Sequence, residues 1–106
     1  MTAAYEFHPE AEIDLEEIWE YIALESVTAA DRVIAEVEET LENLVVFPHQ
    51  GSRRTDLTSR PLRFKRIRDY LIAYAPDEKP LWVIAVMHGQ RSPRVMAAIL
   101  RNREER

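Results

Sequence analysis

Basic side chains crowd one stretch of the chain, and together they could bind a phosphate or a carboxylate-rich partner. Arg63 and Lys65 alternate with the apolar Leu62 and Phe64, and Arg66 follows shortly after. Because successive side chains of a β-strand point to opposite faces, a strand here would project Arg63 and Lys65 from one face. A solvated strand face explains any single cation equally well, since such charges also discourage edge-to-edge pairing. The cluster is the stronger signal, and it makes these residues the first candidate site.

His88 and Arg91 form the second candidate site, where an apolar run ends and a helix is predicted to begin. Side chains at such a junction can project from a rigid scaffold. The alternatives are a half-buried histidine held by the backbone and an ion pair between Arg91 and the acidic helices.

The charges divide the chain into an acidic and a basic part. Residues 1–46 carry 13 acidic side chains and one basic one, a formal charge of −12, whereas residues 47–106 carry 13 basic and 6 acidic ones, a charge of +7. Proteins that bind nucleic acids draw most of their affinity from cations that neutralise phosphates. The total of −5 therefore argues against a general nucleic-acid binder, and we expect no direct sequence-specific binding. Any contact with nucleic acid would fall within residues 53–68.

The composition also argues against several kinds of site. With no cysteine there is neither a disulfide framework nor a thiolate metal site, and the three histidines are far apart. Two glycines cannot build a Gly-rich phosphate loop. We therefore expect no metal and no cofactor. The longest apolar run, Leu81–Met87, is far shorter than the ~20 residues that span a bilayer. With no visible targeting segment, this predicts a cytoplasmic protein that does not bind membranes.

Hydrophobic periodicity predicts a strand, two helices, three strands and a last helix. Tyr5 and Phe7 mark the first strand, and Pro9 opens the first helix. A capping box of Thr28 and Asp31 marks the start of the second helix. The remaining boundaries come from apolar runs and turn residues: a helix end at Pro48, strands over Leu62–Ile67, Tyr70–Ala75 and Leu81–His88, and a helix opened by Ser92 and Pro93.

These elements predict one α+β domain over residues 1–106, with a helical hairpin packed on a small antiparallel sheet. A chain of this length buries roughly two-thirds of its unfolded surface, which is enough for one core. Leu81–His88 is apolar on both faces, as is typical of a central strand. The short connections at 68–69 and 76–80 favour antiparallel hairpins.

The apolar stripes of the two long helices usually belong to a core, but a groove between helices and sheet would accept a partner helix. Large side chains near such a groove are the candidates for contact. They are Trp19, Tyr21, Tyr70, Tyr74 and Trp82.

This combination of a helical hairpin with three later motifs resembles the ParE branch of the ParE/RelE toxin superfamily, from Tyr5 to about Leu100. The motifs are Leu62-Arg63-x-Lys65, Asp69-Tyr70-Leu71-Ile72-Ala73-Tyr74 and Ala85-Val86-Met87-His88-Gly89-x-Arg91. The resemblance implies a sheet curved around its core. It also implies a ParD-like antitoxin whose C-terminal segment wraps over the toxin in a hetero-oligomer.

The resemblance allows two mechanisms, because RelE-like members cleave ribosome-bound mRNA whereas ParE-like members inhibit DNA gyrase and are not enzymes. This chain has Leu71 where RelE-like nucleases carry an arginine, and Ala97 and Ala98 where they carry a terminal tyrosine. These differences favour gyrase inhibition, with no catalytic residues expected. A RelE-like endoribonuclease and a non-toxic helix-binding module remain the alternatives. RNA cleavage needs one group to activate the 2′-hydroxyl, one to protonate the leaving oxygen, and cations around the phosphate. In a RelE-like nuclease, Arg63, Lys65, His88 and Arg91 would supply these groups.

Two sets of contact residues follow from this interpretation. The predicted target-binding residues are Arg63, Lys65, Arg66 and Arg91. The predicted antitoxin-binding residues are Trp19, Ile22, Arg63, Lys65, Tyr74 and Trp82. An acidic antitoxin segment would cross the basic strand, with apolar anchors in the groove.

Overall fold

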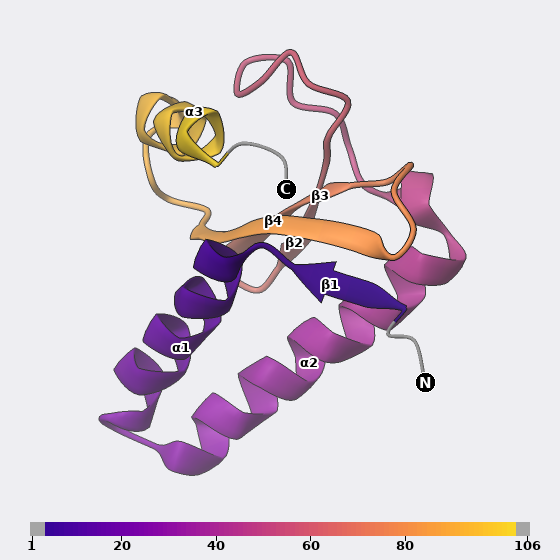
Figure 1. Cartoon of the computed structure of the whole chain (residues 1–106). Coiled ribbons are helices and arrows are strands. Elements are labelled where there is room, and N and C mark those ends of the chain that lie inside the picture. Colours follow the sequence, from indigo (N-terminus) through magenta and orange to yellow (C-terminus); the bar gives the residue numbers. More distant parts are fainter. Residues whose placement is uncertain (1–3, 104–106) are drawn as a thin grey trace.

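A computed structural model describes residues 4–103 of the chain (Figure 1). The order of its helices and strands confirms the predicted β-α-α-β-β-β-α sequence, with a short 3₁₀ turn added after the second helix. The elements are β1 (Tyr5–Phe7), α1 (Pro9–Ala23), α2 (Val27–Val46), the 3₁₀ turn η1 (Pro48–Gln50), β2 (Arg63–Ile67), β3 (Tyr70–Ala75), β4 (Leu81–His88) and α3 (Pro93–Asn102).

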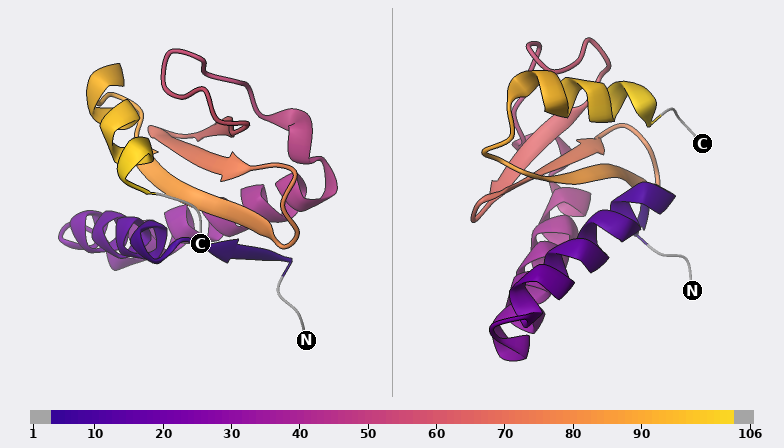
Figure 2. Two further views of the ribbon diagram at one scale, coloured as in Figure 1. Left: turned by 45° about the horizontal axis from the view of Figure 1, so that its top comes forward. Right: turned by 90° about the vertical axis from the view of Figure 1, so that its left-hand side faces the viewer.

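The four strands form one sheet in the order β1-β4-β3-β2. The β2/β3 and β3/β4 pairs are antiparallel hairpins, as their short connections predict, and β4 lies centrally. β1 differs from the predicted antiparallel arrangement, because it pairs with β4 in parallel and makes the sheet mixed. The helical hairpin lies on one face of this sheet, while α3 and the loop before β2 lie on the other (Figures 1 and 2).

Alternation along β3 divides the core into two clusters. Ile72 and Tyr74, both fully buried, face α2, where they pack with Leu41 and Leu44. Leu71 faces the opposite way, together with the side chains under α3 and the loop. Tyr70 lies on the same face of β3 as Ile72 and Tyr74. None of the helices within residues 4–103 is long and apolar enough to cross a membrane.

The start of α2 corrects the predicted capping box. Ser26 is the N-cap, and its Oγ accepts a hydrogen bond from the Ala29 amide at 3.1 Å. Thr28 already lies in the first helical turn, so it cannot cap the helix. Asp31 instead accepts a hydrogen bond from Trp19 Nε1 at 2.8 Å, which joins α2 to α1.

Candidate functional site

The basic side chains of β2 fall on two faces of the sheet. Arg63 pairs with Tyr74 and Lys65 with Ile72, so both cations project from the face that α2 covers. Arg66 lies on the opposite face and is exposed. Strand alternation therefore splits the predicted cluster, and Arg63 with Lys65 is the pair that the structure keeps together.

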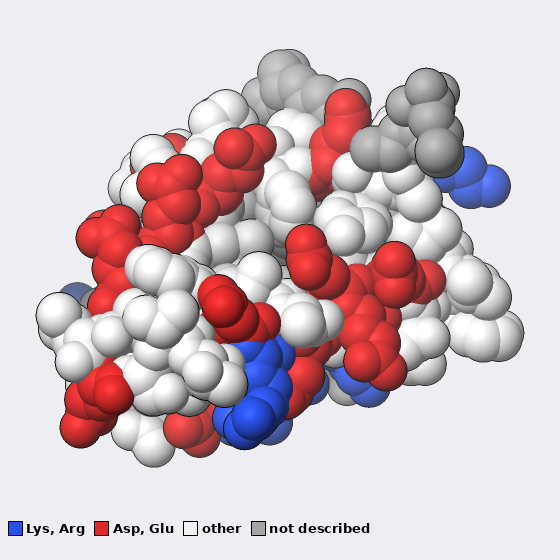
Figure 3. Space-filling model, turned by 90° about the horizontal axis from the view of Figure 1, so that it is seen from below, with Lys and Arg blue, Asp and Glu red and all other residues white. Residues whose placement is uncertain are grey.

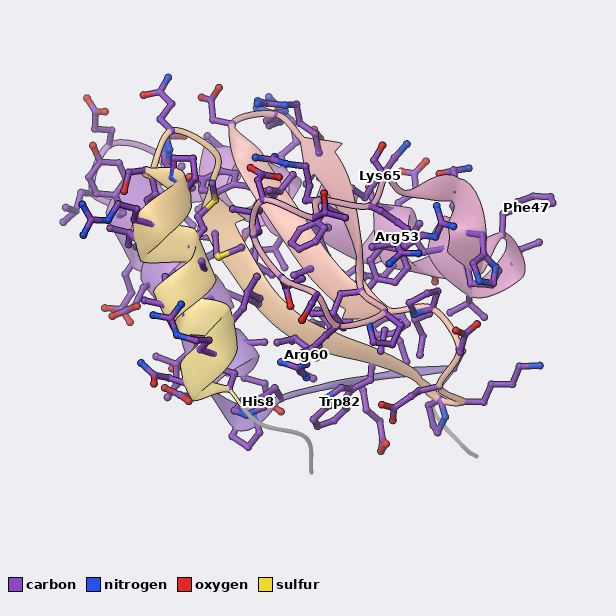
Figure 4. All side chains as sticks on the ribbon, turned by 90° about the horizontal axis from the view of Figure 1, so that it is seen from above. His8, Phe47, Arg53, Arg60, Lys65 and Trp82 are labelled. Carbon is purple, nitrogen blue, oxygen red and sulfur yellow. The ribbon has the colours of Figure 1, made fainter. Side chains whose placement is uncertain are left out.

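Arg63 is half-buried and held by the backbone. Its Nη1 donates a hydrogen bond to Gly51 O at 2.8 Å. With Arg53 it lines a small cavity of about 140 Å³, at whose rim His49 Nε2 lies 3.1 Å from Asp77 Oδ1. Figure 4 places Arg53 and Lys65 toward the end of the molecule that carries Phe47. This end forms a basic surface, which we define as Arg53, Arg63 and Lys65.

The scaffold beneath the basic surface depends on Tyr74 and Gly51. Tyr74 is fully buried, and its hydroxyl donates to Pro48 O at 2.7 Å and accepts from the Gly51 amide at 3.0 Å. Burial raises the pKa of the Tyr74 phenol, although the Gly51 bond and Arg63 oppose this shift. A Cβ at Gly51 would lie 2.6 Å from the Tyr74 hydroxyl and 2.8 Å from Phe64 O. These distances leave no room for a side chain, so the position requires glycine.

The remaining cations of β2 and its turn have other roles. Arg68 Nε donates to Glu36 Oε1 at 2.8 Å, and this bond lowers the pKa of the Glu36 carboxyl. Arg68 therefore has its charge partly neutralised. Arg66 reaches the turn at Gly89, where a Cβ would lie 3.5 Å from its guanidinium.

His88 and Arg91 belong to a separate cavity between the sheet and α1. It has a volume of about 230 Å³, and its lining residues are Asp14, Glu17, Ile18, Tyr21, Tyr70, Val86, His88 and Arg91. His88 Nδ1 accepts a hydrogen bond from the Gln90 amide at 3.2 Å, and the ring contacts Tyr70 edge-on. This bond confirms the alternative of a half-buried histidine held by the backbone. His88 and Lys65 share a face but lie on strands that β3 separates.

The predicted apolar antitoxin contacts differ in whether a partner can reach them. Trp19 and Ile22 are half-buried on α1 and remain available for contact. Tyr74 and Trp82 are 0% and 6% exposed, so in this conformation they are core residues and present no surface to a partner. This corrects the prediction that Tyr74 and Trp82 contact the antitoxin. α2 covers the sheet face that carries Tyr74, and the loop before β2 covers the face that carries Trp82.

An ion pair that sequence reasoning missed lies beside the second cavity. Arg103 donates from Nη1 to Asp14 Oδ2 at 2.6 Å and from Nη2 to Asp14 Oδ1 at 2.9 Å. Arg60 Nη1 donates to the carbonyl oxygens of Leu100 and Arg103, both at 3.1 Å, and so caps the end of α3. No local pattern signals either contact, since the partners lie far apart in the chain.

Within residues 4–103, no group of three or more histidine, aspartate or glutamate side chains could hold a metal ion. The basic surface of Arg53, Arg63 and Lys65 is suited to binding an anionic partner. The cavity at Arg91 is of mixed charge, because Asp14 and Glu17 also line it.

Residues 5–93 match the model of one family of known proteins, described as "ParE toxin of type II toxin-antitoxin system, parDE". The matched range runs from β1 to the first residue of α3, and it includes the basic surface and the cavity at His88. No curated protein matches the chain.

Proposed function

The chain belongs to the ParE toxin family of type II toxin-antitoxin systems, and from this premise we propose that it inhibits DNA gyrase by binding rather than by catalysis. As a toxin of such a system, it pairs with an antitoxin. We further propose that this antitoxin is ParD-like and forms a hetero-oligomer with the toxin.

The observation that carries the proposal is the position of Leu71. RelE-like nucleases, by resemblance, carry an arginine here, whereas Leu71 is 8% exposed and packs in the core under α3. A leucine in this place can neither contact a phosphate nor move a proton. The structure also separates Lys65 from His88 by a strand, whereas general acid and base groups must both reach the reacting atoms. These features support binding as the mechanism.

The basic surface supports an acidic antitoxin segment. Lys65 makes no side-chain hydrogen bond or ion pair with any described residue, and Arg53 makes none either. Such cations attract an acidic partner at long range and fix its orientation on contact. Trp19 and Ile22 would supply apolar contacts where the segment continues along the hairpin.

The test compares two assays with one preparation of pure toxin. We expect loss of gyrase supercoiling, with trapped DNA cleavage complexes, and unchanged protein synthesis in a reconstituted translation system. Charge reversal at Lys65 and Arg63 should weaken the gyrase effect, whereas reversal at Lys79, an exposed cation in the β3–β4 turn, should not. Codon-positioned mRNA breaks with intact supercoiling would reject the proposal in favour of a ribosome-dependent nuclease.

A further inference from the structure

The basic surface surrounds a cavity that can hold one phosphate group. Arg53 and Arg63 line this cavity, whose volume is about 140 Å³. Arg63 Nη1 donates to Gly51 O at 2.8 Å, and the remaining N–H groups of this guanidinium have no partner among the described residues. Arg53 is exposed and has its whole guanidinium free of described partners. Two guanidinium groups beside one small cavity suit an oxyanion such as phosphate.

One carboxylate lies at the same cavity. Asp77 is among the lining residues, and its Oδ1 lies 3.1 Å from His49 Nε2. The side chains of His49 and Asp77 are 57% and 71% exposed, so water screens the negative charge of Asp77. The two arginines therefore outweigh it, and the cavity favours an anion.

Lys65 extends this site along β2. It follows Arg63 on the same face of the strand, so the two Cα atoms are about 6–7 Å apart. Consecutive phosphates on one strand of DNA are separated by a distance of this order. Lys65 makes no side-chain hydrogen bond or ion pair with a described residue, so its charge is available. The basic surface can therefore neutralise two neighbouring phosphates at once.

Phe47 adds an exposed aromatic ring at the same end of the molecule (Figure 4). It is 64% exposed and lies two residues before His49 in the chain. Cations together with aromatic side chains are the combination that binds nucleic acids, because the cations follow the backbone while bases stack on the rings. The ring thus favours nucleic acid over a purely acidic peptide as a further partner of this surface.

The acidic part of the chain limits how DNA can approach. Residues 1–46 carry a formal charge of −12, and Figure 3 shows acidic side chains gathered over the hairpin of α1 and α2. This side repels DNA, so the contact is confined to the basic surface and to a few phosphates. The free chain then binds DNA weakly. The contact becomes effective when a third molecule holds the chain beside DNA and raises the local concentration.

We propose that the basic surface binds the sugar-phosphate backbone of DNA when the toxin is bound to gyrase, with one phosphate between Arg53 and Arg63 and the next at Lys65. The inference rests on the proposed function, because gyrase places the toxin next to the DNA that it cleaves. Base sequence plays no part, since phosphate contacts carry no sequence information. The contact holds the DNA in the trapped cleavage complex.

Fluorescence anisotropy with DNA alone tests the contact without gyrase. For a labelled duplex of about 20 base pairs we expect a dissociation constant on the order of 100 μM at about 50 mM salt. The logarithm of the affinity should fall with the logarithm of the salt concentration with a slope of about −2 to −3, because three cations release counterions. No binding at about 1 mM toxin in low salt would overturn the inference.

Charge-neutralised variants locate the contact. Arg53→Gln with Lys65→Gln should reduce the steepness of the salt dependence by about two and lower the affinity about tenfold or more. Arg94→Gln with Arg101→Gln is the matched control, because it removes the same charge from exposed positions on α3, and it should leave both values nearly unchanged. Circular dichroism checks that each variant folds. Equal losses in the two double variants would show attraction by overall charge alone and would overturn the inference.

Gyrase then separates a DNA contact from a protein contact. Arg53→Gln with Lys65→Gln should leave binding to DNA-free gyrase unchanged, whereas trapping of cleavage complexes should need about tenfold more of this variant than of the unchanged chain. Equal losses in both assays would assign the two cations to gyrase itself and reject the DNA contact. If the unchanged chain traps cleavage complexes without binding DNA alone, the inference fails and the proposed function stands. If it binds DNA as expected but leaves gyrase unaffected, the proposed function fails and the DNA contact stands.

Discussion

Arg103, just past the end of α3, forms a bidentate ion pair with Asp14 of α1, with nitrogen-oxygen distances of 2.6 and 2.9 Å. The pair also forms hydrogen bonds with backbone groups on the edge of β4 that β1 does not reach. β1 ends opposite Val83, and beyond this point Arg103 Nη1 donates to Ile84 O at 3.1 Å while Val86 N donates to Asp14 Oδ2 at 2.9 Å. Two side chains thus take the place of the strand residues that β1 lacks.

Replacing Arg103 by methionine should strongly destabilise the fold. The side chain of Arg103 is 10% exposed and that of Asp14 15%, so the change leaves a poorly solvated carboxylate and an unpaired Ile84 carbonyl. Loss of one partner from a buried pair costs about 3–5 kcal/mol of unfolding free energy. Urea denaturation followed by circular dichroism measures the change.

The control for this prediction is Arg101→Met, on the exposed side of the same helix, which should change stability by less than about 0.5 kcal/mol. The double variant Asp14→Leu with Arg103→Met should cost less than the sum of its single variants, because it leaves no unpaired charge. An additive result would show that the two side chains act independently.

Sequence periodicity predicted the helices and strands because each packs one apolar stripe or face against the core. It could not predict the parallel pairing of β1, since a three-residue strand carries no signal for its partner. Nor could it predict the contact between Asp14 and Arg103, which lie 89 residues apart. The Ser26 N-cap was missed because Thr28 and Asp31 offered a competing local motif.

The candidate site was predictable only in part, for a related reason. Alternation correctly placed Arg63 and Lys65 on one face of β2. An apolar or aromatic pattern, however, does not reveal whether another element covers it. Tyr74 and Trp82 looked like groove residues in the sequence, and the structure buries both.

Gly51→Ala should destabilise the protein much more than Gly89→Ala. A Cβ at Gly51 would lie 2.6 Å from the Tyr74 hydroxyl and 2.8 Å from Phe64 O. Phe64 O is a backbone atom, so it cannot move away without distorting β2. At Gly89 the nearest atom, Asp69 O, would lie 3.2 Å away. Overpacking of this kind costs about 1–3 kcal/mol. Equal shifts of the melting temperature in the two variants would contradict the geometry at Gly51.

Stability should fall as the pH rises above the ordinary tyrosine pKa of about 10, and Tyr74 should contribute to the fall. Burial raises the pKa of the Tyr74 phenol in the folded chain. Above that pH the unfolded chain therefore loses a proton that the folded chain keeps, which favours unfolding. Tyr74→Phe removes this contribution, so its stability should decline less steeply with pH.

The same variant should lower stability at neutral pH by about 1–3 kcal/mol, because Pro48 O and the Gly51 amide lose their partner. Denaturant midpoints at several values between pH 7 and 11 measure both effects. Tyr21→Phe is the control, since Tyr21 is 75% exposed, and its curve should follow that of the unchanged chain. Parallel curves for all three chains would show that Tyr74 does not titrate differently on folding.

Reversing the charges of Arg63 and Lys65 should weaken binding of the antitoxin and reduce its dependence on salt. Both cations project from the same face of β2, so an acidic segment that crosses the strand would meet them together. Charge reversal replaces attraction by repulsion and should lower the association rate about tenfold or more at low ionic strength. Surface plasmon resonance at several salt concentrations measures the rate. Arg101→Glu should leave the salt dependence unchanged, because Arg101 is exposed on α3, which packs on the sheet face opposite to the one that carries Arg63 and Lys65. Equal association rates for the Arg63 and Lys65 variants and the unchanged chain would place the antitoxin on another surface.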